Sequence, residues 1–151
     1  MALDTGDKAH ALDLATDAGT KASLTGKASV VYFYPKDDTS GCTREAIDFT
    51  ALAADFVAAG VQVIGVSKDS VTSHGKFRAK HDLCVLLASD PDGVACEAYG
   101  VWVEKSMYGR KYMGIERATF LIAADGRIAR VWHKVKVPGH AAEVLAAAQQ
   151  L

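Results

Sequence analysis

The stretch SVVYFYPKDDTSGCTRE (residues 29–45) places a strand, a loop and a helix start in direct succession. Residues 30–34 are continuously apolar and rich in β-preferring types, which is typical of a strand buried on both faces, as in a parallel sheet. Polar residues follow and lead to Cys42, and residues 43–60 then predict a helix that stops at Gly60. A lone thiol therefore stands between the end of a strand and the amino end of a helix.

The helix expected over residues 43–60 has one apolar face. At 100° per residue, six apolar side chains share one arc: Ala46, Phe49, Leu52, Ala53, Phe56 and Val57. Cys42 projects onto the middle of this arc, whereas Ile47 projects outside it and is expected to be exposed. A single exposed apolar residue needs no functional explanation.

The other segments alternate between strand-like and helix-like patterns. In chain order we expect a small hairpin over 11–24, a strand over 61–67, a helix over 70–81 capped by Ser70, a strand over 84–89, a short helix through Tyr99, a hairpin over 118–133 turning at Asp125-Gly126, and a helix opened by Pro138. The early βαβ units predict parallel strands with right-handed crossovers. The fold class is therefore α/β, with a mixed central sheet flanked by helices, an N-terminal hairpin and a thioredoxin-like arrangement.

Length, charge and cysteine content restrict the classes of protein. The 151 residues fit one domain, over 1–151, and half of them are hydrophobic, enough for a sizeable core. The formal net charge of -1 gives no reason to expect nucleic acid or a membrane surface as a partner. The start MALDTGDKAH does not resemble a signal peptide, and three cysteines fit a reducing compartment better than a secreted disulfide framework. A cytoplasmic protein is expected.

The position of Cys42 suggests chemistry rather than packing. A free thiol has a pKa near ~8.5 and is a weak nucleophile until it ionises. The amino end of a helix offers unpaired N–H groups and partial positive charge, which favour the thiolate, and an arginine from elsewhere would add to this effect. Asp37 and Asp38 would oppose ionisation if they pointed inward, so both are expected to face water.

Several motifs in the right order resemble one family. The stretch YFYPKDDTSGCTRE, with its Pro-x-x-x-Thr-x-x-Cys pattern, resembles the active-site stretch of peroxiredoxins, in particular the bacterioferritin-comigratory or PrxQ-type branch. SDPDGVACEAYGVW, KSMYGRKYMGIERATFLI and KVKVPGH resemble the same branch, so the likeness covers nearly the whole chain. The chain departs from the family at His10, where a proline is usual, and in a short segment over 20–28.

The resemblance implies a thioredoxin-dependent thiol peroxidase that reduces hydrogen peroxide and organic hydroperoxides. Cys42 would be the peroxidatic cysteine, cycling through sulfenic acid. Thr39 would bind the peroxide, Pro35 would shield the thiolate, Arg117 would stabilise it, and backbone N–H groups near Gly41 and Cys42 would hold the attacked oxygens. Sulfur itself carries the two-electron chemistry, so no cofactor and no metal are expected, and the branch implies a monomer.

The same resemblance raises the question of how the sulfenic acid is reduced. Relatives often carry a resolving cysteine five residues after the peroxidatic one or in the following helix, and these positions hold Ile47 and Arg78 here. A one-cysteine mechanism is therefore expected, with thioredoxin or another thiol as reductant. The alternative is an atypical two-cysteine enzyme that uses Cys84. Taken alone, Cys84 and Cys96 read as buried hydrophobic residues.

Other interpretations remain open at this point. Taken alone, Thr39 could merely form a turn or cap, Pro35 could merely end a strand, and Arg117 could form a surface ion pair. Glu45 could either bridge to an arginine or to the loop, or be a solvated helix residue. A redox sensor or binding protein on the same fold would share the reactive thiol without turnover. A metal site from His74, His81 and Cys84 has weak spacing support, and a thioredoxin-type disulfide oxidoreductase lacks its C-x-x-C motif.

Overall fold

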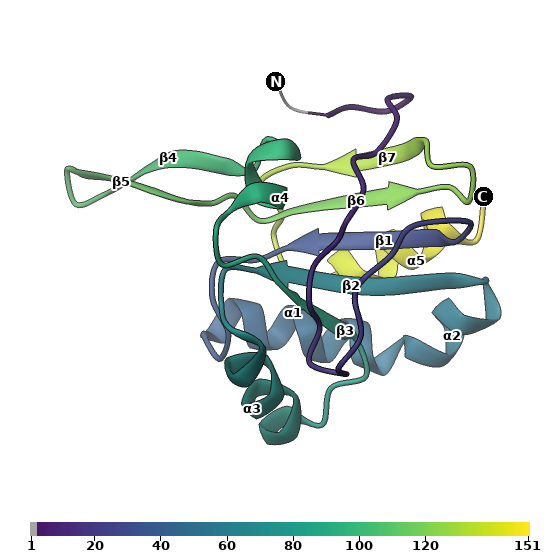
Figure 1. Cartoon of the computed structure of the whole chain (residues 1–151), viewed down its shortest axis with the longest axis horizontal. Coiled ribbons are helices and arrows are strands. Elements are labelled where there is room, and N and C mark those ends of the chain that lie inside the picture. The colour runs from purple at the N-terminus through teal and green to yellow at the C-terminus, as the bar shows by residue number, and fades with distance from the viewer. Residues whose placement is uncertain (1–2) are drawn as a thin grey trace.

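The computed structural model describes residues 3–151, so the first two residues of the expected domain lie outside it. A five-stranded mixed sheet forms the centre, in the order β3-β2-β1-β6-β7 (Figure 1). Its strands are β1 (Ala28–Phe33), β2 (Val61–Ser67), β3 (Leu86–Ser89), β6 (Ala118–Ile122) and β7 (Ile128–Trp132). Strands β1, β2 and β3 run parallel, whereas β6 and β7 are antiparallel to their neighbours. The expected thioredoxin-like fold is thereby confirmed.

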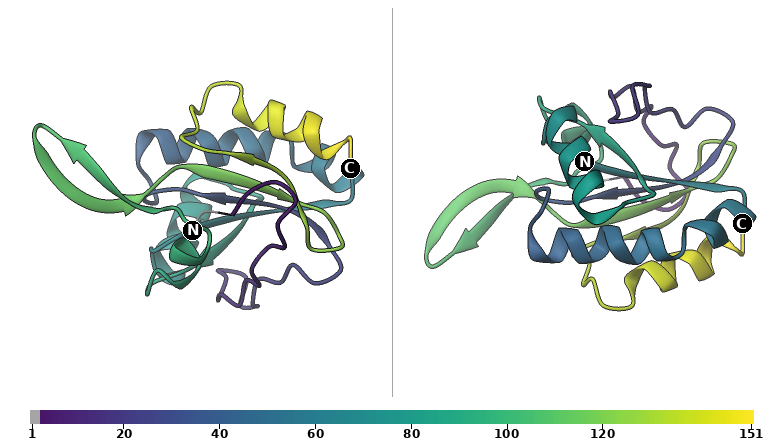
Figure 2. Two further views of the ribbon diagram at one scale, coloured as in Figure 1. Left: turned by 90° about the horizontal axis from the view of Figure 1, so that it is seen from above. Right: turned by 90° about the horizontal axis from the view of Figure 1, so that it is seen from below.

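Helices cover both faces of the sheet. The helices are α1 (Ser40–Ala51), α2 (Ala53–Ala58), α3 (Val71–His81), α4 (Val94–Ala98) and α5 (His140–Ala148). The first two and α5 lie on one face, and α4 with the N-terminal segment lies on the other (Figure 2). Side chains of β1 alternate between these layers. Val30 and Tyr32 join the core beneath α1 and α5, and Val31 and Phe33 join the opposite core.

The long helix expected over residues 43–60 is in fact two helices with an earlier start. Helix α1 begins at Ser40, so Cys42 lies inside its first turn rather than before it. The backbone leaves the helical path at Leu52, and α2 follows before Gly60 ends the run with φ of +73°. This break shifts the helical phase, which explains why Val57 is 77% exposed although the arc predicted it to be buried.

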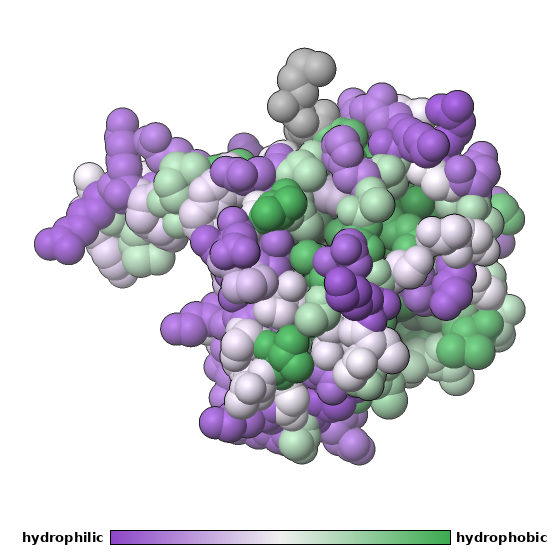
Figure 3. All heavy atoms as spheres, in the orientation of Figure 1, coloured by the Kyte–Doolittle hydropathy of each residue, from purple (hydrophilic) through white to green (hydrophobic). Residues whose placement is uncertain are grey.

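Two other elements differ from expectation. The hairpin over 11–24 consists of a turn with one antiparallel bridge, Ala15 to Lys21, and no regular strands. A two-stranded ribbon, β4 (Trp102–Met107) and β5 (Arg110–Ile115), was not predicted. It extends away from the body (Figure 1), and strongly hydrophilic residues lie beside moderately hydrophobic ones along it (Figure 3). Because most of its residues are exposed on both sides, it lacks the apolar alternation that identifies a strand.

Two local predictions are confirmed, whereas the strand expected over 84–89 begins at Leu86 and the helix expected from Pro138 begins at His140. Ser70 caps α3, its hydroxyl accepting a hydrogen bond from the Ser73 N–H at 3.1 Å. Strands β6 and β7 form the hairpin expected around Asp125-Gly126. None of the helices within residues 3–151 has the length and apolar character needed to cross a membrane.

Candidate active site

The sheet topology brings two distant segments together at the carboxyl end of β1. Strands β1 and β6 are antiparallel, with Phe33 opposite Ala118, so the start of β6 lies where β1 ends. Arg117 immediately precedes β6, and Cys42 follows β1 after a short loop. The Arg117 Nη2 atom donates a hydrogen bond to Cys42 Sγ at 3.3 Å. The expected thiol and the expected arginine are therefore in direct contact.

Cys42 lies in the first turn of α1 and is only 2% exposed. Thr39 is the N-cap residue, with extended backbone angles, and its carbonyl accepts from the Thr43 N–H at 2.8 Å. The N–H groups of this first turn have no partner within the helix and carry partial positive charge. Together with the Arg117 guanidinium, they surround the sulfur with groups that favour a negative charge.

Gly41 allows the arginine to approach the sulfur closely. A Cβ atom at this position would lie 3.2 Å from Arg117 Nη2, closer than most side-chain contacts in proteins. Any larger residue would push the guanidinium away from Cys42. The glycine before the cysteine is thus explained by packing against Arg117, although its backbone angles are ordinary for any residue.

Glu45 takes part in the same cluster through a buried ion pair. Arg117 Nη1 donates to Glu45 Oε1 at 2.7 Å, and the Glu45 side chain is 1% exposed. Its second oxygen, Oε2, has no hydrogen-bond partner. Burial raises the pKa of Glu45 to about 7, and the neighbouring Arg117 opposes this rise. The sequence left open whether Glu45 bridges to an arginine or is solvated, and the structure shows the ion pair with Arg117.

Thr39 and Pro35 lie on the exposed loop before the helix. Thr39 Oγ1 donates to the Lys36 carbonyl at 2.8 Å and makes no side-chain cap to α1. This leaves the lone pairs of its hydroxyl oxygen open to a further donor. Pro35 is exposed at the end of β1. Neither residue contacts Cys42 through a hydrogen bond, unlike Arg117.

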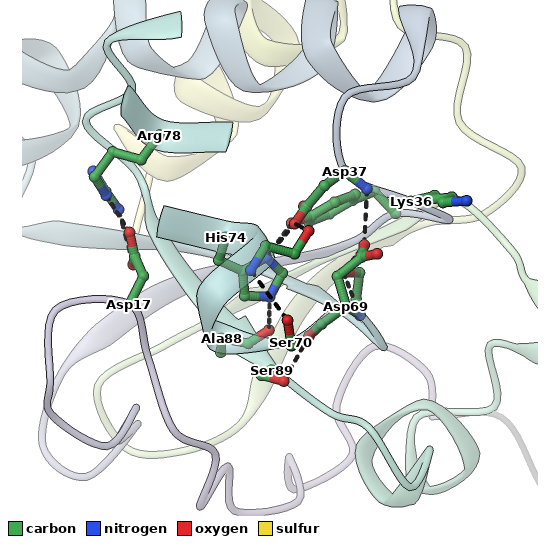
Figure 4. A network of polar contacts seen from close by, with 12 residues as sticks. Asp17, Lys36, Asp37, Asp69, Ser70, His74, Arg78, Ala88 and Ser89 are labelled. Carbon is green, nitrogen blue, oxygen red and sulfur yellow. Dashed lines mark hydrogen bonds and ion pairs between the residues drawn. The ribbon is translucent and has the colours of Figure 1, made fainter. Parts of the chain in front are cut away.

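One of the two loop aspartates is placed differently from expectation. Asp38 is exposed, as predicted, and pairs with Lys80 and His81. Asp37 was expected to face water but is buried, and its carboxylate accepts hydrogen bonds from three side chains (Figure 4). Burial would raise the pKa of Asp37, but hydrogen bonds from His74 and Tyr34 outweigh it and hold this pKa below its usual value. Those partners lie on other elements, so local sequence could not reveal them.

The two remaining cysteines have opposite environments. Cys96 is fully buried, as expected, and burial together with Asp90 raises the pKa of its thiol. Cys84 was expected to be buried but is exposed, because it precedes β3 at the sheet edge. Its N–H donates to Thr50 Oγ1 near the end of α1 at 3.0 Å. It also borders a cavity of about 230 Å³ lined by Phe49, Phe56 and others.

The two positions where relatives carry a resolving cysteine hold residues with other contacts. Ile47 is 38% exposed on α1, off the buried face, as predicted. Arg78 on α3 binds Asp17 and donates to the carbonyl oxygens of Leu83 and Val85. It fastens the end of α3 to two neighbouring loops, a packing role that its position in the sequence does not indicate.

The histidines considered as metal ligands bind other groups. His74 contacts Asp37 and the Ala88 carbonyl, and His81 contacts Asp38. Within the described range 3–151, no group of three or more histidine, cysteine, aspartate or glutamate side chains is arranged to hold a metal ion. Lys105 on β4 was missed by the sequence analysis. Burial and the charge of Arg117 lower the pKa of Lys105, which places a second cation near the site.

Comparisons with known proteins agree with this geometry. The AhpC/TSA family matches residues 5–131. A putative peroxiredoxin bcp from Coxiella burnetii is 51% identical over 148 residues, covering 96% of this chain and 98% of that protein. Peroxiredoxin Bcp from Bacillus subtilis is 47% identical over 148 residues, covering 96% and 94%.

Solved structures resemble the chain over nearly its full length. The Xylella fastidiosa PrxQ structure superimposes with a TM-score of 0.90 at 40% identity, covering 99% of this chain and 98% of that one. The bacterioferritin comigratory protein of Xanthomonas campestris, described for its alkyl peroxide reduction activity, gives a TM-score of 0.88 at 44% identity, covering 95% and 98%.

Proposed function

Because this chain belongs to the AhpC/TSA family as a peroxiredoxin of the Bcp/PrxQ type, we propose that Cys42 is its peroxidatic nucleophile. The observation that supports this most directly is the 3.3 Å contact between Cys42 Sγ and Arg117 Nη2 in the first turn of α1. Peroxidase activity follows from the family, and the assignment of residues to steps is our proposal.

The reaction begins with attack of the Cys42 thiolate on the terminal oxygen of a hydroperoxide. The S–O bond forms as the O–O bond breaks, the sulfur is oxidised to sulfenic acid, and the alkoxide or hydroxide leaves with a proton as alcohol or water. Negative charge spreads from sulfur onto both oxygens during this step. Arg117 and the N–H groups near Gly41 and Cys42 are positioned to stabilise this charge, and such donors each contribute about 2.7–4 kcal/mol in other enzymes.

Thr39 and Pro35 would complete the site. The Thr39 hydroxyl already donates to the Lys36 carbonyl, so its oxygen can accept the O–H of the hydroperoxide. This hydrogen bond would orient the peroxide before attack. Pro35, at the entrance to the loop, would limit access of water to the thiolate. The substrates would be hydrogen peroxide and organic hydroperoxides, in line with the activity named for the Xanthomonas relative.

We propose a one-cysteine cycle in which an external thiol, such as thioredoxin, reduces the sulfenic acid. Ile47 and Arg78 occupy the usual resolving positions, and Cys84 lies beside Thr50. Thr50 is eight residues beyond Cys42 on α1, a rise of about 12 Å, whereas a disulfide needs α-carbons within about 7 Å. The competing candidate, a Cys42–Cys84 disulfide, is favoured only by the exposure of Cys84 and would require much of α1 to unwind.

Treatment with one equivalent of hydrogen peroxide, followed by peptide mapping with mass spectrometry, tests the recycling route. We expect a sulfenic acid on Cys42 and no linked peptide. A Cys42–Cys84 crosslinked peptide would instead establish the two-cysteine cycle. Consumption of peroxide with excess dithiothreitol, measured for the parent and Cys42→Ser, separates a peroxidase from a redox sensor, which would show negligible turnover in both.

We also propose that the protein acts as a single-domain monomer in the cytoplasm. One sheet carries both hydrophobic cores, which supports one folding unit. Sparse cysteines and an active thiol both suit a reducing compartment. Sedimentation measurements at micromolar concentration test the oligomeric state, and a dimer in both redox forms would overturn the proposal.

A further inference from the structure

Asp37 is the most heavily bonded side chain of the loop that leads to Cys42. Tyr34 Oη donates to its Oδ1 at 2.6 Å, and Ser73 Oγ and His74 Nδ1 meet its Oδ2 at 2.8 and 2.7 Å. Its own N–H donates to Asp69 Oδ2 at 2.8 Å. The loop is thereby fastened to Tyr34 just after β1, to α3 and to the segment after β2, and Figure 4 shows the contacts with His74 and Asp69.

His74 is fully buried and faces two acceptors. Its Nδ1 meets the Asp37 carboxylate and its Nε2 meets the Ala88 carbonyl oxygen at 3.0 Å. A carbonyl or ionised carboxylate can only accept, so each of the two contacts needs a hydrogen on the ring nitrogen that meets it. Asp37, whose side chain is 4% exposed, is held against this ring, because buried polar groups require hydrogen-bond partners.

A buried polar pair is a poor choice if stability alone is required. Apolar residues of similar volume often stabilise a core as well or better, whereas a hydrogen-bonded pair fixes the geometry of its two ends. Here one end lies on α3 and the other lies two residues before Thr39, whose hydroxyl bonds to Lys36 in the same loop. Asp38 between them has φ of +58°, a strained conformation for a residue with a side chain, so the loop needs contacts that hold it.

We propose that His74 is a positioning residue of the peroxidatic site: through its contact with Asp37 it holds the loop of residues 35–39 in the conformation that presents Thr39 and the first turn of α1 to the peroxide. This inference rests on the proposed role of Cys42. Neither Asp37 nor His74 touches the reacting atoms. They act by keeping the loop in place.

The two halves of the catalytic cycle place opposite demands on this loop. Attack on peroxide needs the loop and first turn folded around Cys42. Reduction by an external thiol needs access to a residue that is 2% exposed, so the same segment has to open. Loosening the Asp37–His74 pair should therefore slow the first half-reaction and speed the second, whereas a purely structural defect would not change them in opposite directions.

Two substitutions at one position separate the contact with Asp37 from the contact with Ala88. In His74→Asn the amide nitrogen lies near the place of Nδ1 and can still donate to Asp37. In His74→Gln the longer side chain reaches toward Ala88 and leaves Asp37 without this donor. Asp17→Asn is the matched control, because it removes the negative charge that pairs with Arg78 on the same helix without touching the loop (Figure 4).

Amide exchange of residues 36–42 and the two half-reactions, with hydrogen peroxide and then dithiothreitol, give the test. For His74→Gln we expect exchange about 10-fold faster, peroxide oxidation about 10-fold slower and sulfenic acid reduction several-fold faster, since a hydrogen bond to a charged group is lost. His74→Asn should recover most of the loss. Unchanged exchange in His74→Gln, equal acceleration in Asp17→Asn, or half-reactions that fall together would overturn the proposal.

Two measurements remain decisive if His74→Gln fails to fold. In the parent protein, ¹⁵N spectra at neutral pH should show both ring nitrogens of His74 protonated, and a single neutral tautomer would overturn the inference. Ser73→Ala removes one donor to Asp37 and should speed exchange of residues 36–42 by about 3-fold. Neither readout depends on peroxidase activity. If the Cys42 proposal is wrong, the parent protein will fail to consume peroxide, and that result is independent of both readouts.

Discussion

Helix α1 holds one thiol, Cys42, in its first turn, and a second thiol, Cys84, lies beside its last turn. The surroundings of the two thiols are opposite. Cys42 is 2% exposed, contacts the Arg117 guanidinium and lies at the positive end of a helix. Cys84 is exposed at the sheet edge, and its backbone is bonded to the neutral hydroxyl of Thr50. The comparison teaches that accessibility and reactivity are separate properties, because a thiolate is favoured by nearby positive charge and not by exposure.

Replacing the proposed nucleophile gives the largest expected effect. Cys42→Ser should lower the rate of peroxide consumption by at least about 1000-fold, since a serine oxygen cannot be oxidised as sulfur is when the O–O bond breaks. Stopped-flow assays with hydrogen peroxide and dithiothreitol measure this directly, with circular dichroism as a check on folding. Activity within 10-fold of the parent would make Cys84 or Cys96 the reactive sulfur and reverse the comparison.

Removing the positive charge of Arg117 should make the reactivities of Cys42 and Cys84 more similar. Arg117→Gln should slow the peroxide reaction by about 100-fold, the size expected when one charge-stabilising donor is lost. Iodoacetamide labelling, with both cysteines quantified in the same digest, should show slower labelling of Cys42 and unchanged labelling of Cys84.

The Arg117 substitution also leaves Glu45 buried without its partner, which can destabilise the fold by about 3–5 kcal/mol. The double variant Arg117→Gln/Glu45→Gln removes both charges and serves as the control. If the double variant reacts with peroxide as fast as the parent, Arg117 acts only on folding. If it stays as slow as the single variant, Arg117 acts on the sulfur.

Glu45 provides a pH-dependent test of the same cluster. Burial raises its folded-state pKa from 4.5 to about 7, so the folded chain holds a proton that the unfolded chain loses. The contribution of Glu45 to stability is therefore full below about pH 4.5 and is lost as pH rises to about 7. Glu45→Gln should remove this loss, so its free energy of unfolding should gain up to about 3 kcal/mol over the parent between pH 5 and pH 8.

Urea denaturation of the parent and Glu45→Gln at both pH values measures the difference. The same variant leaves the whole charge of Arg117 to Cys42, so the labelling ratio of Cys42 to Cys84 above pH 7 should rise a few-fold. A constant difference in unfolding free energy across this pH range would show that Glu45 is ionised throughout.

Local sequence patterns predicted the strands, caps and turns around this site, because each of these features depends on neighbouring residues. The apolar run of β1, the cap at Ser70 and the turn at Asp125-Gly126 each depend on residues within one element, and each was found as expected. The family motif supplied Arg117, which spacing alone could not have placed, since it lies 75 residues from Cys42.

What the sequence could not show depends on contacts between distant elements. Asp37 reads as a water-facing loop residue because nothing near it indicates that His74 will lie against it. Cys84 reads as the start of a buried strand, but the strand begins at Leu86 and lies at the edge of the sheet. The break at Leu52 lies in a stretch without proline or glycine, so local sequence does not indicate it.

The smallest expected effect belongs to the second thiol. Cys84→Ser should leave peroxide consumption within about 2-fold of the parent, because Cys84 contacts Thr50, which lies about 12 Å along α1 from Cys42. Steady-state assays with thioredoxin as well as dithiothreitol are needed, since a small thiol could replace a resolving cysteine and hide its loss. Turnover retained with dithiothreitol but lost with thioredoxin would show that α1 unwinds far enough for Cys84 to reach Cys42. Retention with both reductants would leave Cys42 as the one sulfur of the cycle, reduced directly by the incoming thiol.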